Sequence, residues 1–519
     1  MTTSTLTKTL RLLFVCTFLS LGASKRYVQR RTRNGPVRGI VQHVHSAGRV
    51  ERFMGIPYAK PPIGNLRFEA PEPASPWRGV KDALELSPAC PQPIDGVTYI
   101  QGHVPDFNRT SEDCLYLNVY APRTSQQQRR ARGDNQRKRK AVLVFVHGGS
   151  YLHGMGAMLE GSHLAAKDII VVTFNYRLGA LGFLEADDEV FPGNYGLRDQ
   201  LLALRWIQDN IAYFGGDPTR VTLDGHSAGG CTVGLLALLP AAQGLFSRVI
   251  QQSGSPFAHW AITRRPSSPN LIFKLFTASL GCYGNGTAEV KACLKNISSE
   301  QMEQVIFRSP SASVLQNTIF SSLVPSFRPV VDGVVIPDTP ERLALIGRSG
   351  VTEFLTGTTT DEGLGAASTI LERYYNKVDN FYSQDRPDPL LLVDLLGGSR
   401  AHLPNINSLL ERLLDQYYVW PYDVSENQSK DGLVEIVGDF FISAPTHKSA
   451  EIMRERNATV YFYNYDYISR YDGWAGVIHG SELFYLSGYP FSGMRRHDKA
   501  GRTMASRLIQ LWSSFAKNG

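Results

Sequence analysis

The sequence has no run of about 20 consecutive apolar residues, the length that a membrane-spanning helix requires. Its first apolar run, Leu12–Leu21, is too short to span a bilayer. That run follows Lys8 and Arg11 and precedes small residues, which is the pattern of a secretory signal peptide, and we place this signal at residues 1–24. We therefore expect the mature chain to be exported, with no membrane span.

The sequence also lacks internal repeats and any linker that would divide it into halves. Its content of 43% hydrophobic and 10% aromatic residues is sufficient for a large buried core. We therefore predict one domain over residues 25–519.

Excess positive charge is confined to one segment. The net charge is +7, and residues 123–140 carry eight basic residues and one acidic residue, so the rest of the chain sums to zero. This segment has no apolar periodicity, so we predict a solvated, disordered basic loop and no nucleic-acid binding. Two other interpretations of the loop stand beside this one: a site for a protein or polyanionic partner, and a processing site at the Arg-x-x-Arg pattern of Arg129–Arg132.

Cysteine is scarce, with six residues, of which Cys16 belongs to the signal peptide. An oxidising compartment favours local pairs, so the economical pairing of the others is Cys90 with Cys114 and Cys282 with Cys293. Cys231 is then left over and is predicted to be a small buried residue. Five Asn-x-Ser/Thr sequons also fit a secretory route: Asn108, Asn285, Asn296, Asn427 and Asn457.

Buried strands alternate with helices, which predicts an α/β fold with a large, mostly parallel central sheet. The expected strands are residues 141–146, 169–174, 221–223, 249–251, 351–356 and 460–466, and residues 39–59 alternate like a hairpin. The expected helices are residues 197–211 and 231–239. Residues 257–350 and 364–455 are predicted to be helical insertions over the carboxyl ends of the strands, where active sites of such sheets lie.

Ser227 lies between two glycines in "GHSAG", after a strand and before a helix. A tight strand-to-helix turn of this kind holds a serine in a strained conformation with its hydroxyl exposed. The serine needs a histidine as base and a carboxylate to orient that histidine, in the chain order serine, acid, histidine. "GTTTDEG" offers Asp361 and Glu362 after one expected strand, and "GVIHGSE" offers His479 after the last.

An acyl-transfer site also needs backbone N–H groups that stabilise a developing oxyanion. The strand at 141–146 runs into "HGGS", whose small residues allow a substrate to approach the backbone. The N–H of Ala228, directly after the serine, is predicted to complete this oxyanion hole.

From residue 35 onward the sequence resembles the type-B carboxylesterases and cholinesterases, which have the α/β-hydrolase fold. The motifs that carry the resemblance are "SEDCLYLNVYAP" (111–122), "NYRLGALGFL" (175–184), the stretch 193–230 around Ser227, "QQSGSPFAHWA" (251–261), "GTTTDEG" and "GVIHGSE". The resemblance implies a catalytic triad of Ser227, Glu362 and His479, with Glu362 rather than Asp361 as the acid.

The same resemblance implies roles for several neighbours of the triad. It assigns the oxyanion hole to Gly149, Ser150 and Ala228, and it places His226, Ser253 and Trp260 behind the triad or in the wall of the acyl pocket. It also pairs Arg67 with Glu112 near the rim of the active-site gorge, and the two expected disulfides fall where the family has its first two.

Four departures from the family pattern modify this expectation. Ser150 replaces the third glycine of the oxyanion loop and is expected to narrow the acyl group that fits. His226 stands where choline-specific members have Glu, and residues 101–114 lack the tryptophan that binds choline, so no choline preference is expected. The third disulfide of the family has no counterpart. The sequence ends within what resembles the last helical region, so we expect a C-terminal piece to be missing.

We therefore predict a secreted serine carboxylesterase that acts on neutral carboxylic esters without a metal or cofactor. The alternative is a neuroligin-like adhesion protein on a hydrolase scaffold, because "HGGSYLHGMGAMLEGSHLA" and "TYIQ" resemble neuroligins and the basic loop lies where neuroligins carry an insert. Vertebrate-type neuroligins have lost the serine, which this sequence keeps. Two further alternatives are a homodimer and a cell-surface location through an anchor beyond this sequence.

Overall fold

The structure is a computed structural model. It describes residues 26–44, 48–93, 98–104, 107–123, 139–264, 269–307, 325–347, 350–367, 408, 412, 415–417, 426–470, 472, 476–492 and 498–519. The signal peptide and most of the basic loop, predicted from the sequence, lie outside these residues.

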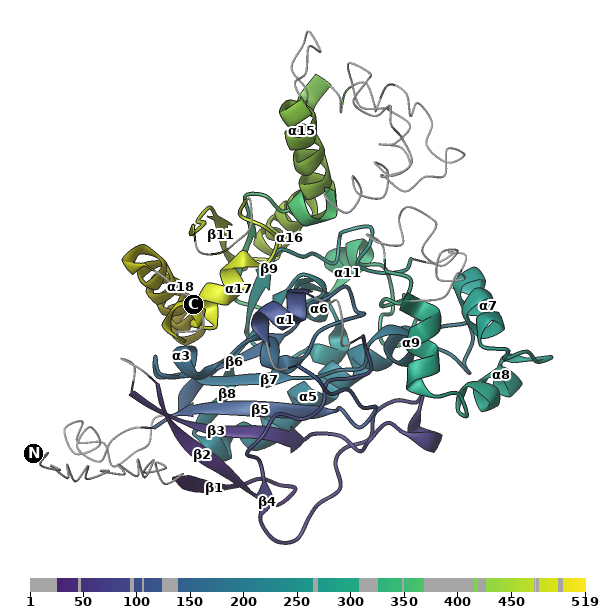
Figure 1. Ribbon diagram of the computed structural model, residues 1–519, viewed down its shortest axis with the longest axis horizontal. Coiled ribbons are helices and arrows are strands. Elements are labelled where there is room, and N and C mark those ends of the chain that lie inside the picture. The colour runs from purple at the N-terminus through teal and green to yellow at the C-terminus, as the bar shows by residue number, and fades with distance from the viewer. Residues whose placement is uncertain are drawn as a thin grey trace, which may run out of the picture.

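A twisted 11-stranded sheet forms the centre of the molecule (Figure 1). Its strands are β1 (Tyr27–Arg31), β2 (Pro36–Val44), β3 (Gly48–Pro57), β4 (Lys81–Asp82), β5 (Tyr116–Pro122), β6 (Lys140–Val146), β7 (Ile170–Phe174), β8 (Gly216–His226), β9 (Arg248–Gln252), β10 (Glu353–Thr359) and β11 (Thr459–Tyr465). The main path runs β1-β2-β3-β5-β7-β6-β8-β9-β10-β11, and β4 pairs with β2. Neighbours from β7 to β11 are parallel, whereas those from β1 to β7 along this path are antiparallel.

The central parallel strands β6 and β7 are almost entirely apolar and buried because helices cover both faces of the sheet there. Strand β6 shows this directly: Val142 and Val144 pack into the core cluster that includes α5 (Tyr195–Asn210) and α6 (Ala228–Leu236). Leu143 and Phe145 point the other way, into the cluster that includes α18 (Lys499–Asn518). Because successive side chains of a strand point to opposite faces of the sheet, the two core clusters lie on opposite faces of this sheet.

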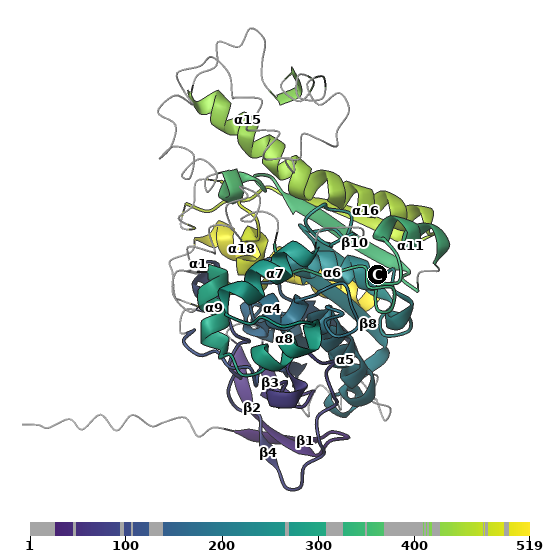
Figure 2. The same ribbon diagram turned by 90° about the vertical axis from the view of Figure 1, so that its right-hand side faces the viewer.

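The remaining helices flank and cap this core. They are α1 (Thr98–His103), α3 (Ser162–Ala165), α4 (Gly179–Phe183), α7 (Pro269–Ser279), α8 (Thr287–Leu294), α9 (Ser299–Phe307), α11 (Pro340–Ile346), α15 (Glu426–Gly438), α16 (Ala444–Glu455) and α17 (Ser481–Leu486). Figure 2 shows α15 and α16 as a long helical arm above the sheet. A π-helical turn, Asp439–Ser443, joins α15 to α16. No helix among the described ranges is both long and apolar enough to cross a membrane.

The predicted fold class is confirmed, and the element boundaries differ locally. Strand β8 begins five residues before the predicted 221–223, and α6 begins directly at Ala228. Strand β10 begins at Glu353 rather than at residue 351. The residues at the start of β8 are polar, so hydrophobicity does not indicate a strand there, but their backbone pairs with β6 from Gly216 onward.

Candidate active site

Ser227 occupies a sharp turn between β8 and α6. Its backbone has φ 57° and ψ −123°, a strained conformation for a residue with a side chain. Its N–H donates to the carbonyl of Gln252 on β9, at 2.9 Å, and its carbonyl accepts the N–H of Cys231 at 2.8 Å. These two bonds hold the strained residue between the sheet and the helix, and its side chain is half-buried.

The two glycines of "GHSAG" are required by close backbone contacts. A Cβ on Gly229 would lie 2.1 Å from the carbonyl oxygen of Val146, and one on Gly225 would lie 2.4 Å from that of Gly229. Gly148 also lies against the turn, since a Cβ there would be 2.8 Å from that of Ser227. Strand β6, its following loop and the serine turn therefore meet without room for side chains.

The loop after β6 presents backbone N–H groups beside Ser227. Gly149 and Ser150 have φ of 108° and 54°, and none of the described residues accepts a hydrogen bond from their N–H groups. The N–H of Ala228 is the first of α6 and has no acceptor within its helix. Gln92 fixes the end of this loop, because its side chain donates to the carbonyl of Gly154 at 2.8 Å and accepts its N–H at 2.7 Å.

Glu362 and His479 are brought together across 117 residues of sequence. The Nδ1 of His479 donates to Oε2 of Glu362 at 2.5 Å, and the N–H of Thr359 donates to Oε1 of Glu362 at 2.8 Å. The Glu362 side chain is 1% exposed. This arrangement fixes the ring and leaves Nε2 of His479 as the nitrogen that can accept a proton.

Asp361, the other acid that the sequence offered, has a different place. Its Oδ2 accepts the N–H of Val477 at 2.7 Å, and its own N–H donates to the carbonyl of Val477 at 3.1 Å. Asp361 therefore fastens the loop after β10 to the loop that carries His479, and of these two acids Glu362 is the one hydrogen-bonded to the imidazole.

His226 connects the imidazole with the serine turn. Its ring centroid lies 4.6 Å from that of His479, and it directly precedes Ser227. Burial, and secondarily the charges of His479 and His103, hold the pKa of His226 well below its ordinary value. His226 is therefore a neutral ring against the base.

Three buried carboxyl groups surround His479 and the serine turn. Burial raises the pKa of Asp224 to about 8 and that of Glu482 to about 7, and Gln252 donates to Asp224 at 2.7 Å. Burial lowers the pKa of His479, but the charge and hydrogen bond of Glu362, together with the charge of Glu482, outweigh it and raise this pKa above its ordinary value. The imidazolium form is thus stabilised chiefly by Glu362.

Glu482 was not identified from the sequence. It is fully buried on α17, three residues after His479. The signal available in the sequence is the acid of "HGSE", three residues after the histidine and in the first turn of α17.

Trp260 and Ser253 are both buried. The indole N–H of Trp260 donates to the carbonyl of Phe441 at 2.7 Å, so the π-helical turn holds this side chain in place. Ser253 has φ 48° and donates its N–H to Gly357 at 3.0 Å. A Cβ on the next residue, Gly254, would meet the carbonyl oxygen of Ser227 at 2.1 Å, so this segment packs directly beneath the turn.

The expected ion pair and both expected disulfides are present. Arg67 pairs with Glu112 through Nε and Oε2 at 2.7 Å and also donates to the carbonyl of Ile297 at 2.6 Å. Disulfides join Cys90 to Cys114 and Cys282 to Cys293, and Cys231 is free and buried.

The sequons are compatible with modification on the surface. Four of the five have exposed asparagines, namely Asn108, Asn285, Asn296 and Asn457. The side chain of Asn427, on α15, lies outside the described residues. Within the described ranges, no group of three or more histidines, cysteines and acidic residues is arranged to hold a metal ion.

The sequence matches the Carboxylesterase family over residues 26–519. It is 33% identical to Neuroligin-2 of Mus musculus over 96% of this chain and 61% of that protein. It is also 33% identical to an acetylcholinesterase of Bungarus fasciatus, over 94% of this chain and 78% of the relative. The chain thus spans less than two thirds of the length of its neuroligin relative. With a match of this extent on a sheet of this topology, the chain belongs to the carboxylesterase family.

Proposed function

We propose that the chain is a secreted serine carboxylesterase that hydrolyses neutral carboxylic esters through an acyl-enzyme. The observation that carries this proposal is the 2.5 Å contact between His479 Nδ1 and Glu362 Oε2, beside a strained serine turn. A disused site would have no need to keep an oriented imidazole, its buried acid and a strained serine.

The proposed chemistry is acyl transfer in two steps. Ser227 Oγ attacks the ester carbonyl carbon while Nε2 of His479 takes the hydroxyl proton, and the N–H groups of Gly149, Ser150 and Ala228 receive the oxyanion. The intermediate collapses when His479 gives this proton to the leaving alcohol oxygen. Water then attacks the acyl-enzyme by the same route and releases the carboxylic acid and free Ser227.

The proposed substrate class rests on His226 and on the composition of residues 101–114. His226 is buried and neutral, so it provides no anion for a cationic alcohol group. The lack of a tryptophan in residues 101–114 removes the expected cation–π platform. Neutral esters are therefore the proposed substrates.

Turnover of p-nitrophenyl acetate and butyrate by the purified chain tests this proposal, with Ser227→Ala as the matched control. We expect turnover that the variant loses, and stoichiometric labelling of Ser227 by a fluorophosphonate. Hydrolysis at the same background rate in both proteins, with no labelling, would reject the esterase function.

An adhesion function is the second candidate, supported by the 33% identity to Neuroligin-2. A neuroligin-like protein would bind a protein partner and would show neither turnover nor labelling. The partner surface would not need Ser227, so binding by Ser227→Ala would equal that of the wild type. Activity, labelling and partner-binding assays on the wild type and Ser227→Ala therefore distinguish the two candidate functions.

An extracellular location is part of the proposal. Two disulfides and four exposed sequon asparagines are typical of secreted domains. A cell-surface location through an anchor beyond this sequence, a homodimer and a polyanionic partner for residues 123–140 are further proposals. Retention on a heparin column, compared with a variant lacking residues 124–139, tests the last of these.

A further inference from the structure

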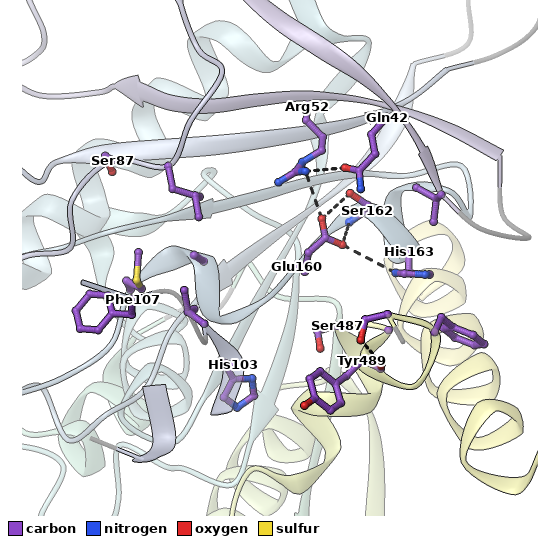
Figure 3. A pocket seen from close by; sticks show the side chains of 18 of the residues that line it. Gln42, Arg52, Ser87, His103, Phe107, Glu160, Ser162, His163, Ser487 and Tyr489 are labelled. Carbon is purple, nitrogen blue, oxygen red and sulfur yellow. Dashed lines mark hydrogen bonds and ion pairs between the residues drawn. The ribbon is translucent and has the colours of Figure 1, made fainter. Parts of the chain in front are cut away.

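A cavity of about 730 Å³ lies apart from the serine turn. It is bounded by the β2–β3 hairpin, the segment around α3, the end of α1 and the loop that follows α17 (Figure 3). Its volume is within the range of sites for small molecules. None of Ser227, Glu362 and His479 lines it, so it is not part of the candidate active site.

Polar groups gather at one side of this cavity, around Arg52 (Figure 3). Arg52 Nη1 donates to the side-chain oxygen of Gln42 at 2.6 Å, and the guanidinium carbon lies 5.7 Å from the centroid of the Tyr120 ring. Its Nε is buried without a hydrogen-bond partner, since the nearest carboxylate oxygen, of Glu160, is 4.0 Å away. Nη2 donates weakly to Met54 Sδ at 3.7 Å, so a ligand in the cavity would have to bind the remaining N–H groups of Nη1 and Nη2 rather than the buried Nε.

Glu160 lies at ion-pair distance from Arg52 without a hydrogen bond to it, and Ser162 donates to both of its carboxylate oxygens. One carboxylate oxygen accepts the hydroxyl of Ser162 at 2.6 Å, and the other accepts the N–H of Ser162 at 3.0 Å. The oxygen of Gln42 is likewise occupied by Arg52. The free N–H groups of Arg52 are the donors that this side of the cavity offers a ligand, and a guanidinium suits an acceptor such as a carboxylate.

The charges along the cavity favour an anion as well. Burial lowers the pKa of His103 to about 4, and burial also lowers that of His163, so both rings are neutral near pH 7. The charged side chains in the lining are then Arg52, Arg109 and Glu160, an excess of one positive charge.

The opposite side of the cavity is apolar (Figure 3). Phe107, Val104 and Met155 line it and belong to a small core cluster of their own. The floor is aromatic: His103 stacks on Phe484 at 4.0 Å, and Tyr489 meets Phe484 edge-on at 5.8 Å. Such walls accept a hydrocarbon chain or an aromatic ring.

We propose that this cavity binds an amphiphilic monocarboxylate, with its carboxylate on Arg52 and its apolar body along Phe107. This site would be separate from the acyl pocket and would not require Ser227, so the proposal stands whether or not the chain is an esterase. The ligand class is a free carboxylic acid with a medium-length alkyl or aryl group.

The test is calorimetric titration of the Ser227→Ala protein with decanoate, decanol and decyltrimethylammonium. We expect saturable binding of decanoate, weakened at least tenfold by Arg52→Gln and by Phe107→Ala. Arg38→Gln is the matched control, because Arg38 lies on β2, is paired with Asp82 and does not line the cavity. Thermal unfolding verifies that each variant is folded, and the Phe107 variant keeps the test valid if Arg52→Gln fails to fold.

A decanoate analogue with a terminal diazirine locates the site by photocrosslinking. Labels on residues 98–109 or 487–492 would support the proposal. Three results would overturn the proposal: labels confined to the segments around Ser227 and Trp260, binding of decanoate by Arg52→Gln and Phe107→Ala as tight as in the parent protein, or tighter binding of the cationic amphiphile than of decanoate.

Discussion

The imidazole rings of His226 and His479 lie with their centroids 4.6 Å apart. His226 is buried and its pKa is held well below the ordinary value, so it stays neutral while His479 titrates. The negative charges that act on His479 are those of Glu362 and Glu482. The pH dependence of the site is therefore set by these two carboxyl groups.

The first prediction concerns the acid limb of the pH profile. The pKa of His479 is raised above 6.5, and its protonated form cannot accept the proton of Ser227, so kcat/KM should fall as the pH drops through a midpoint above 6.5. Glu362→Gln should lower this midpoint and reduce kcat by about 10³–10⁴-fold, since the imidazolium loses its partner. The rate of p-nitrophenyl acetate hydrolysis across pH measures both.

Asp466→Asn is the control for that variant, because Asp466 is an exposed acid after β11 that accepts the hydroxyl of Thr360, two residues before Glu362. Its profile should match that of the wild type. A wild-type midpoint below 6.5 would contradict the proposed charge environment of His479.

The second prediction concerns Glu482, which is fully buried and does not contact a substrate in the proposed mechanism. Its charge raises the pKa of His479, so Glu482→Gln should move the acid limb to lower pH. Near and above pH 8 the rate should change only a few-fold, because Glu362 still orients the ring. If thermal unfolding shows that the variant is folded and its acid limb does not move, then Glu482 does not raise the pKa of His479.

The third prediction concerns Ser150 in the oxyanion loop. Its side chain is exposed at a backbone with φ 54°, where glycine is favoured. Ser150→Gly should therefore keep the fold and raise the ratio of butyrate to acetate turnover, because a side chain beside the oxyanion hole is removed. If Ser150→Ala gave the same increase as Ser150→Gly, loss of the hydroxyl rather than space for the acyl group would be the cause.

The fourth prediction concerns Gly229. Gly229→Ala would place a Cβ 2.1 Å from the carbonyl of Val146, and neither backbone can move freely. We expect a loss of unfolding free energy of about 1–3 kcal/mol, together with loss of fluorophosphonate labelling. Gly350→Ala, at a position where a Cβ meets nothing within 4 Å, should leave both measurements unchanged.

Short-range signals in the sequence determined the architecture and the serine turn. Apolar runs such as residues 141–146 predict strands that are buried on both faces of the sheet. The two glycines around Ser227 indicate a backbone contact that is too close for any residue with a side chain. The order of serine, acid and histidine, together with the family resemblance, was sufficient to nominate Glu362 and His479. Each of these inferences depends on local sterics or on a long motif, which is why the sequence was sufficient to make it.

Only the tertiary structure decided what Asp361, Glu482 and Arg52 do. Asp361 and Glu362 are adjacent in the sequence, and their roles separate because opposite sides of one loop face Val477 and His479. The charge on Glu482 depends on its burial, which no local pattern reports. Arg52 and Phe107 enclose one cavity although 55 positions separate them. Burial and long-range contact arise from the whole packed chain, and so they remained beyond inference from residue types and spacing.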